Sequence, residues 1–235
     1  MTRASIRPAS RGGFTLLELL VVLVLVGILS GLSYNAVHAG LVRAKQAACA
    51  SNLRQMGTAI MLYAAENNGR LPQTSHSGVK SKSWIYSLAA YLDDVDKVRI
   101  CPADPFGKKR LAEQGTSYTL NSIVFNPSYD GDGNIVTKFD SLLRIPKPSR
   151  TLLAFVVSDQ KFGIGADHTH SEEWRNWVSV LVDTTPDRFR PGRASTDRTE
   201  GRSNYLYADG HVESMDARKF KTLIDQGSNP AMPPE

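Results

Sequence analysis

The chain has 235 residues, of which 41% are hydrophobic and 22% are charged, and this suits one membrane segment plus one modest globular domain. The formal net charge is +5, but three arginines and no acid lie in the first 13 residues, so removing that segment leaves +2. Because no basic stripe then remains, the composition argues against a nucleic-acid-binding protein.

An apolar run follows the basic segment. Residues 14–32 read FTLLELLVVLVLVGILSGL and carry one charged side chain, Glu18. As a helix this run spans about 28 Å, close to the thickness of the hydrocarbon core of a bilayer. We therefore predict a transmembrane helix over residues 14–35, with the arginines on the cytoplasmic side and the C-terminal part outside.

Glu18 is the unusual residue of this run. A carboxylate inside a membrane helix costs a few kcal/mol and usually marks function. It lies one helical turn after Phe14, so a cut after Gly13 would create an amine on Phe14 able to neutralise it, within one subunit or between neighbours. An acid tolerated near the membrane interface is the alternative interpretation.

The register of these features resembles the cleavage signal of type IV prepilins and type II secretion pseudopilins. It consists of a short basic leader ending in Gly12-Gly13, then Phe14, Thr15, two leucines, Glu18 and the apolar run. The resemblance implies that prepilin peptidase, a membrane enzyme, removes residues 1–13 and N-methylates Phe14.

Two other fates of the N-terminus compete with this one. Small residues at Val37-His38-Ala39 would suit an ordinary signal peptidase, which would remove the whole apolar run. The length of the run and the presence of Glu18 argue against that cut. An uncleaved signal anchor is the remaining alternative.

The helical pattern continues beyond the membrane segment. Residues 36–66 are rich in good helix formers, and no proline occurs between Pro8 and Pro72. Apolar side chains recur at spacings of four and three, at Cys49, Leu53, Met56, Ile60 and Tyr63. We predict an amphipathic continuation that packs on the protein's own globular domain and ends at Asn67-Asn68-Gly69, with Gly27, Gly31 and Gly40 as points where the helix can bend.

The rest of the chain predicts a globular domain over residues 67–226. We expect a short helix at 83–92, strands at 117–124, 151–157, 177–182 and 204–207, and an Asp209-Gly210 turn leading into a strand at 212–215. A last helix is expected at 217–225, before a flexible tail at 227–235. The predicted fold is α+β, with the long N-terminal helix packed on a small antiparallel sheet as in type IV pilins.

The two cysteines, Cys49 and Cys101, form no CxxC pair, which argues against a thiolate zinc site. In an exported domain they favour one disulfide, which would close a loop of about 50 residues and contribute roughly 4 kcal/mol. Two free thiols are the alternative.

Scattered blocks over most of the chain resemble pilin-like proteins with an H-X9-DG domain. These blocks are CASNLRQMGTAIMLYAAENNGRLP, a tryptophan followed by YL, then CP, SYTLN and NYLYADGHV. The resemblance implies pairing of Cys49 with Cys101. The chain lacks the histidine after which this domain is named, because the residue ten positions before Asp209 is Thr199. Any role of that histidine is therefore in question here.

Polar residues in the C-terminal half offer one candidate metal site. On a strand, His168 and His170 would point to one face, next to Asp167, and Asp209 and His211 complete the candidate set. A polar loop and a hairpin turn explain these residues equally simply.

A calcium loop is the second candidate. Asp130, Asp132 and Asn134 alternate with glycines, as at the start of such a loop, but the twelfth position is Ser141, with Asp140 beside it. An ordinary Asp-Gly turn is the alternative. The sequence has no P-loop, dinucleotide fingerprint or Ser-His-Asp order, so we expect no enzyme.

These features together predict a structural subunit, a pseudopilin or minor pilin. We expect it to sit in the bacterial inner membrane as a single-pass protein with its C-terminal domain outside. Its expected partners are prepilin peptidase, the lipid bilayer, an inner-membrane assembly platform, and copies of itself or other pilin-like subunits. The fibre would be a type II secretion pseudopilus or a type IV pilus-like fibre, and the alternative is a membrane-anchored extracytoplasmic ligand-binding module that does not assemble.

Overall fold

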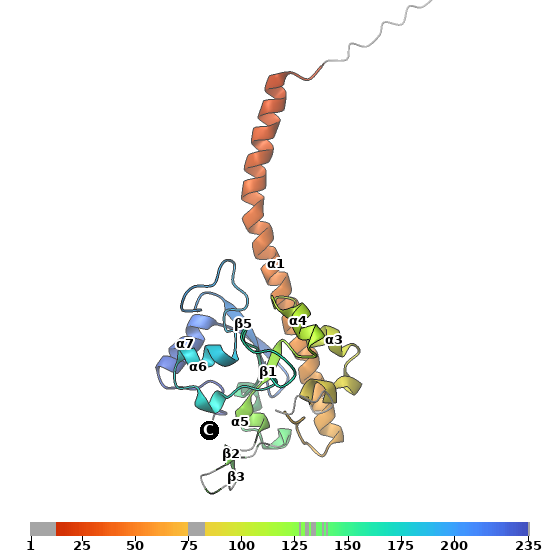
Figure 1. Cartoon of the computed structure of the whole chain (residues 1–235), viewed down its shortest axis with the longest axis vertical. Helices are drawn as coiled ribbons and strands as arrows, with labels where there is room; N and C mark the ends of the chain where they lie inside the picture. The colour runs from red at the N-terminus through yellow and green to blue at the C-terminus, as the bar shows by residue number, and fades with distance from the viewer. Residues whose placement is uncertain are drawn as a thin grey trace, which may run out of the picture. The chain divides into compact units, whose positions relative to one another are not determined.

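The computed structural model describes residues 13–74, 83–126, 128–129, 132, 135–137, 139 and 141–234 (Figure 1). The chain divides into two compact units, residues 1–40 and 41–235. A single helix, α1 (Leu16–Glu66), begins in the first unit and ends in the second. It continues through Gly27, Gly31 and Gly40, so the helix is not interrupted at any of these glycines.

Helix α1 ends where the sequence predicts. Asn68 and Gly69 both have left-handed backbone angles, with φ values of 56° and 79°. The Gly69 amide donates to the carbonyl of Ala64 at 2.7 Å, which satisfies one of the free carbonyls at the helix end. The chain therefore turns away from the helix axis at Asn68-Gly69.

A four-stranded antiparallel sheet forms the centre of the second unit, in the order β1-β4-β5-β6. Its strands are β1 (Tyr118–Leu120), β4 (Leu152–Val156), β5 (Arg202–Tyr207) and β6 (Val212–Asp216). A separate two-stranded ladder joins β2 (Ser128–Tyr129) to β3 (Ile135–Thr137). The strands expected at 151–157, 204–207 and 212–215 are thus present, as is the predicted α+β class.

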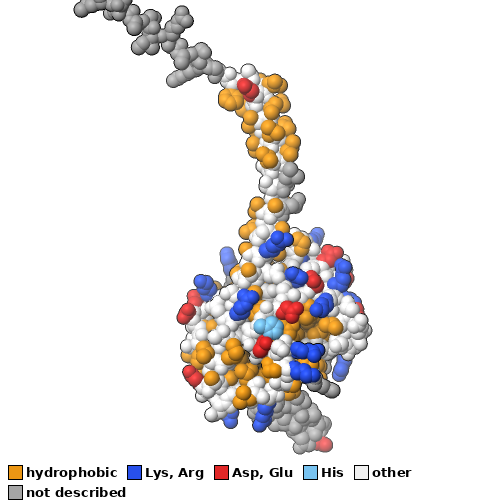
Figure 2. All heavy atoms as spheres, turned by 180° about the vertical axis from the view of Figure 1, so that it is seen from behind, with side chains coloured by type: hydrophobic (Ala, Val, Ile, Leu, Met, Phe, Trp, Pro, Cys, Tyr) orange, Lys and Arg blue, Asp and Glu red, His pale blue; other side chains and the backbone are white. Residues whose placement is uncertain are grey.

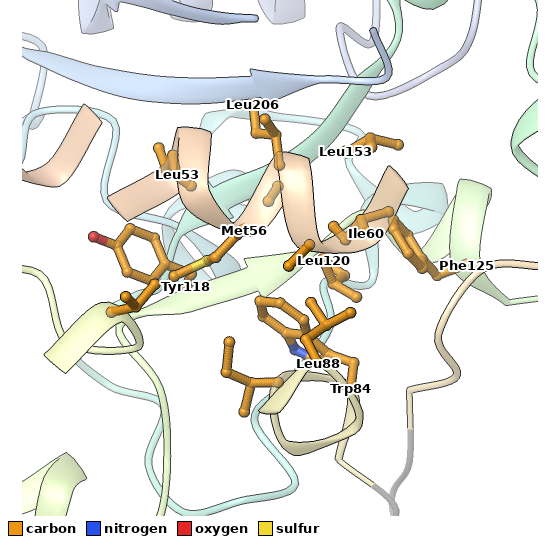
Figure 3. Close-up of a cluster of buried hydrophobic side chains, with 14 of the residues drawn as sticks. Leu53, Met56, Ile60, Trp84, Leu88, Tyr118, Leu120, Phe125, Leu153 and Leu206 are labelled. Carbon is orange, nitrogen blue, oxygen red and sulfur yellow. The ribbon is translucent and has the colours of Figure 1, made fainter. Parts of the chain in front are cut away.

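The second half of α1 packs on one face of this sheet. The predicted apolar stripe is buried, with Cys49, Leu53, Met56 and Ile60 fully enclosed. Figure 3 shows Leu53, Met56 and Ile60 beside sheet residues Tyr118, Leu120 and Leu206, together with Trp84 and Leu88. Burial of this stripe is what holds the helix to the domain, because buried apolar surface is the main favourable term in folding.

A second apolar cluster covers the other face of the sheet. Alternate strand side chains, among them Phe155, Tyr205 and Tyr207, point to this side. They pack against helices α6 (Trp177–Asp183) and α7 (Ala217–Asp225), whose buried residues include Val180 and Phe220. The domain therefore has three layers: helix α1, the sheet, and the α6–α7 pair.

Short helices fill the connections between these layers. They are α2 (Trp84–Ser87), η2 (Ala89–Tyr91), α3 (Val95–Val98), α4 (Gly107–Ala112), α5 (Ser122–Phe125), η3 (Leu142–Arg144), η4 (Pro148–Arg150) and η5 (Ser171–Glu173). The helix expected at 83–92 is split into α2 and η2. The strand expected at 117–124 ends at Leu120, because the Asn121 side chain accepts from the Ile123 amide at 3.2 Å and starts α5.

The strand expected at 177–182 is wrong, since this segment is helix α6. Its run of valines favours a strand, but Asn176 and Ser179 form a capping box that starts a helix. Trp177 and Val180 are buried while Val178 and Val182 are exposed, which is the periodicity of a helix in contact with a core on one side. Tertiary packing and the cap have overridden strand propensity.

The segment expected to be a flexible tail, residues 227–235, makes contacts with the domain in the structure. The Asn121 amide donates to the Ala231 carbonyl at 2.7 Å, and the Asn229 amide donates to the Ser171 carbonyl at 2.7 Å. Ala231 is fully buried in the α6–α7 cluster. The tail is therefore fixed to the domain as far as these contacts reach.

Candidate functional site

The start of helix α1 carries the residues of the predicted cleavage signal. Residues 13–15 are not helical and lead directly into the first turn at Leu16. Phe14 is 80% exposed, and nothing lies within 4 Å of the position where a side chain at Gly13 would begin. The Gly13–Phe14 peptide bond thus lies in exposed, non-helical chain just before helix α1.

Thr15 and Glu18 form a capping box at this helix start. The Thr15 amide and hydroxyl donate to Oε2 of Glu18 at 2.9 and 2.8 Å, and the Glu18 amide donates to Oγ1 of Thr15 at 3.2 Å. Two free backbone donors of the first turn are satisfied in this way. The T-x-x-E spacing of Thr15 and Glu18 is the sequence signal for this cap. From the sequence we predicted that Glu18 pairs with the amine of Phe14, and we did not predict the cap.

This cap explains how an acid is held at the end of an apolar helix. The carboxylate lies at the positive end of the helix dipole and is fixed by two hydrogen bonds. Both Thr15 bonds go to Oε2, and a carboxylate has acceptor sites on both oxygens. Thr15 therefore orients the Glu18 carboxylate, which keeps acceptor sites for a further donor.

The helix turns that follow present apolar side chains all round. From Leu16 to Leu29 the large hydrophobic residues of α1 are exposed, and Figure 2 shows them covering the surface of this segment. By length and composition this is a helix able to cross a membrane, and none of its most apolar window is buried within the protein. Such a surface needs lipid or other apolar helices around it.

Residues 8–34 match the family model described as the prokaryotic N-terminal methylation motif. The chain carries a prepilin-type methylation motif. The match covers the predicted cleavage position at Gly13-Phe14 and the whole apolar run over residues 14–32, which lies in the helix that is long and apolar enough to cross a membrane. No curated protein and no solved structure matched this chain, and the H-X9-DG resemblance of the C-terminal domain is not confirmed.

Cys49 and Cys101 are free thiols, so the disulfide expected from the sequence is not formed in the structure. Both are buried and belong to the same apolar cluster. The Tyr118 hydroxyl donates to Cys49 Sγ at 3.4 Å. The fold therefore brings together two residues 52 positions apart in the chain, as reduced thiols.

The histidines do not assemble a metal site among the residues that the structure describes, because no group of three His, Cys, Asp or Glu side chains is placed to hold an ion. His168 is buried with its Nδ1 2.8 Å from Asp167 Oδ1, and its ring lies 5.3 Å from that of His170. The His170 backbone amide donates a hydrogen bond to the Asp183 carboxylate at 2.7 Å.

Asp209 and His211 lie at the turn between β5 and β6, where the sequence predicts a hairpin. His211 Nδ1 lies 2.5 Å from Asp209 Oδ1, and its ring stacks on Tyr207. Gly210 has a φ of +87°, and a side chain there would begin 2.7 Å from the Met61 methyl group. The Asp-Gly pair is thus a tight turn seated against helix α1, which favours glycine for its backbone conformation, while a side chain there would also displace the flexible end of Met61.

Thr199, which replaces the histidine of the H-X9-DG pattern, belongs to a loop stabilised by local hydrogen bonds. Its amide donates to Ser195 Oγ at 3.2 Å and its hydroxyl donates to Asp197 at 2.9 Å. Of the calcium candidates, Asp130 and Asn134 lie outside the described residues, and Asp132 is an exposed turn residue. The calcium loop stays a prediction.

Proposed function

We propose that this protein is a structural subunit, a pseudopilin or minor pilin, that is cut between Gly13 and Phe14 and assembles into a pseudopilus or pilus-like fibre. The observation that carries the proposal is the capped Glu18 at the start of an apolar, uncovered helix, directly after an accessible Gly13–Phe14 bond. The matching methylation motif supports the same conclusion.

The chemistry would proceed from the cut. Prepilin peptidase hydrolyses the Gly13–Phe14 bond and methylates the new amine, which stays protonated near neutral pH. That cation and Glu18 neutralise each other, so neither charge is left alone among apolar helices. Because Thr15 already orients the carboxylate, the amine of the same or a neighbouring subunit meets a fixed acceptor.

Apolar helices would then form the core of the fibre. Once subunits leave the bilayer, the surface from Leu16 to Leu29 can be covered only by the same surface on other subunits or by related pilin-like chains. The sequence leaves two kinds of fibre open, a type II secretion pseudopilus and a type IV pilus-like fibre. We favour the type II secretion pseudopilus, on the resemblance of the sequence alone.

The first test is the mass and N-terminal residue of the protein recovered from membranes, with and without prepilin peptidase. We expect a chain that starts at N-methylated Phe14 only when the peptidase is present. A chain that starts at Gly40 would indicate an exported soluble domain. An intact N-terminus in the presence of the peptidase would indicate a plain anchor, and either result would refute the proposal.

A second test separates the charge of Glu18 from its role as a cap. Glu18→Gln keeps a side chain that can complete the capping box but removes the charge. Thr15→Ala keeps the charge and removes the cap, at about 1 kcal/mol of helix stability. We expect Glu18→Gln to be processed but to give no fibres, and Thr15→Ala to give reduced fibre yield.

Fibre yield is measured in the sheared extracellular fraction of cells that make equal amounts of each variant, with Thr15→Ser as the matched control that preserves the cap. Normal fibres from Glu18→Gln would contradict the amine–carboxylate pairing. A membrane-anchored binding module, the alternative, would show no fibres for the unmodified protein either.

A further inference from the structure

The positive charge of the chain is concentrated at one end of the second unit. This basic end consists of residues 41–46, 186–202 and 214–219, which carry nine lysines and arginines and four acids. A fifth acid, Asp159, pairs with Arg188 from outside these segments. The basic end therefore has a formal charge of +4, whereas the rest of the chain after the leader has 16 basic and 18 acidic residues, a charge of −2.

Strand β5 runs alongside the second half of α1, and its start marks the basic end. The Asn204 side-chain amide donates to the Gln46 carbonyl at 2.8 Å. Further along both elements, a side chain at Gly57 would begin 2.8 Å from a methyl group of Leu206. The first residue of β5, Arg202, therefore lies at the end of the unit where α1 enters it.

The other two segments of the basic end meet at the start of β5. Phe189 and Arg202 exchange two backbone hydrogen bonds, at 2.9 and 3.2 Å, and the Ala217 amide donates to the Gly201 carbonyl at 3.0 Å. The loop between Phe189 and Arg202 and the first turn of α7 thus lie together, and Figure 1 shows the blue loop that precedes β5 at this end of the unit.

Asp187 holds the loop in shape from inside. Its carboxylate is fully buried and accepts from Arg190 at 3.2 Å and from Arg198 at 2.7 Å. Two arginines thus share one buried acid, and Arg193 between them is exposed. Within the described part of the chain, five exposed cations of the basic end form no ion pair with an acid: Arg43, Lys45, Arg193, Arg218 and Lys219.

The apolar run of α1 ends a short distance before the basic end. Arg43 follows Leu32 by eleven residues, which is about 16 Å along a helix. The polar headgroup layer of one leaflet takes up roughly 5–8 Å of that distance. The remaining 8–11 Å, roughly, is close to the Debye length of about 8 Å, and long Lys and Arg side chains can reach across part of it.

We propose that the basic end binds the anionic phospholipid headgroups of the leaflet on its own side, and so holds the domain on the membrane surface before the subunit leaves the bilayer. The inference rests on the membrane-spanning α1 of the proposed function, but not on the cut or on fibre assembly. Anionic lipids attract Lys and Arg side chains held within a Debye length and need no pocket for it. Nucleic acid carries the same charge, but α1 keeps this end next to lipid.

The test uses the full-length chain in vesicles of phosphatidylcholine, alone or mixed with phosphatidylglycerol, with dansyl-labelled headgroups in both. Trp177 reports on the basic end, because its Nε1 donates to the Asp197 carbonyl in the loop at 2.6 Å. We expect more energy transfer from tryptophan to dansyl in the anionic vesicles. The difference should vanish at about 1 M salt, where the Debye length is about 3 Å. Equal transfer in both kinds of vesicle at low salt would overturn the proposal.

A pair of double variants places the attraction on the molecule. Arg193→Glu with Lys219→Glu reverses two exposed charges of the basic end, and should abolish most of the rise in energy transfer. Arg70→Glu with Arg150→Glu is the matched control. It makes the same change in net charge at exposed positions, one just after the C-terminus of α1 and one just before β4, whose start pairs with the far end of β5. An equal loss in both double variants would refute the assignment to the basic end.

Two further measurements separate this inference from its neighbours. Duplex DNA is added to the anionic vesicles at an equal concentration of phosphate groups, and we expect the rise in energy transfer to persist. DNA that removes the rise would assign the basic end to nucleic acid and overturn the lipid proposal. Flotation with the neutral vesicles tests the anchor itself: a chain that does not float would refute a membrane-spanning α1, and this inference with it, whatever the fibre yield.

Discussion

Asn121 lies at a junction of four segments of the domain, and replacing it tests that description. Its fully buried side chain donates to the carbonyls of Leu152 and Ala231, at 2.9 and 2.7 Å. Its Oδ1 accepts from the Ile123 amide at 3.2 Å and from the Ser171 hydroxyl at 2.8 Å. One amide thus links strand β4, helix α5, helix η5 and the C-terminal tail.

Asn121→Ala removes all four hydrogen bonds of this side chain. At about 1 kcal/mol for each bond, the expected loss is about 3–5 kcal/mol of the free energy of unfolding. That is a large share of the roughly 5–15 kcal/mol that stabilises a typical domain. Asn176→Ala is the matched control, because Asn176 also starts a helix but is exposed, and its loss should cost only about 1 kcal/mol.

Both variants are measured as mature full-length chains in detergent by denaturant unfolding, followed through tryptophan fluorescence. Trp174 and Trp177 lie in the α6–α7 cluster and report its opening. Amide hydrogen exchange at Ala231 and Met232 should also rise in Asn121→Ala but not in Asn176→Ala. Equal losses of stability in the two variants would refute our account of the buried junction and of the fixed tail.

Two further predictions concern the β5–β6 hairpin. Gly210→Ala should destabilise the domain by about 1–2 kcal/mol, because the position has a positive φ, whereas Gly192→Ala, where nothing lies within 4 Å, should be nearly neutral in the same unfolding assay. Burial raises the pKa of Tyr207 from about 10 to about 12. The unfolded chain therefore ionises first, and the stability due to Tyr207 is complete below pH 10 and is lost as the pH rises to about 12. Tyr207→Phe should flatten this loss in unfolding curves recorded across that range, and an unchanged pH dependence would contradict the predicted shift.

The sequence by itself determined the features that depend on local pattern. In an apolar environment the apolar run that begins at Phe14 has to be a helix, because its backbone N–H and C=O groups find hydrogen-bond partners there only within the segment itself. The 49–63 stripe and the Asn68-Gly69 stop likewise follow from helical periodicity and from the few residues that accept a left-handed backbone. The Asp209-Gly210 hairpin and helix α7 were predictable for the same reason.

Only the tertiary structure decided what depends on neighbours distant in the chain. Valine spacing in residues 177–182 is compatible with strand or helix, and the choice was made by the Asn176 cap and by burial of Trp177 and Val180 under the sheet. Likewise, the polar, proline-containing tail looks flexible until Asn121 and Ser171 provide its partners. The sequence favoured a disulfide between Cys49 and Cys101, whereas the structure holds both as buried free thiols, and Cys49 is enclosed only because helix α1 has packed on the sheet.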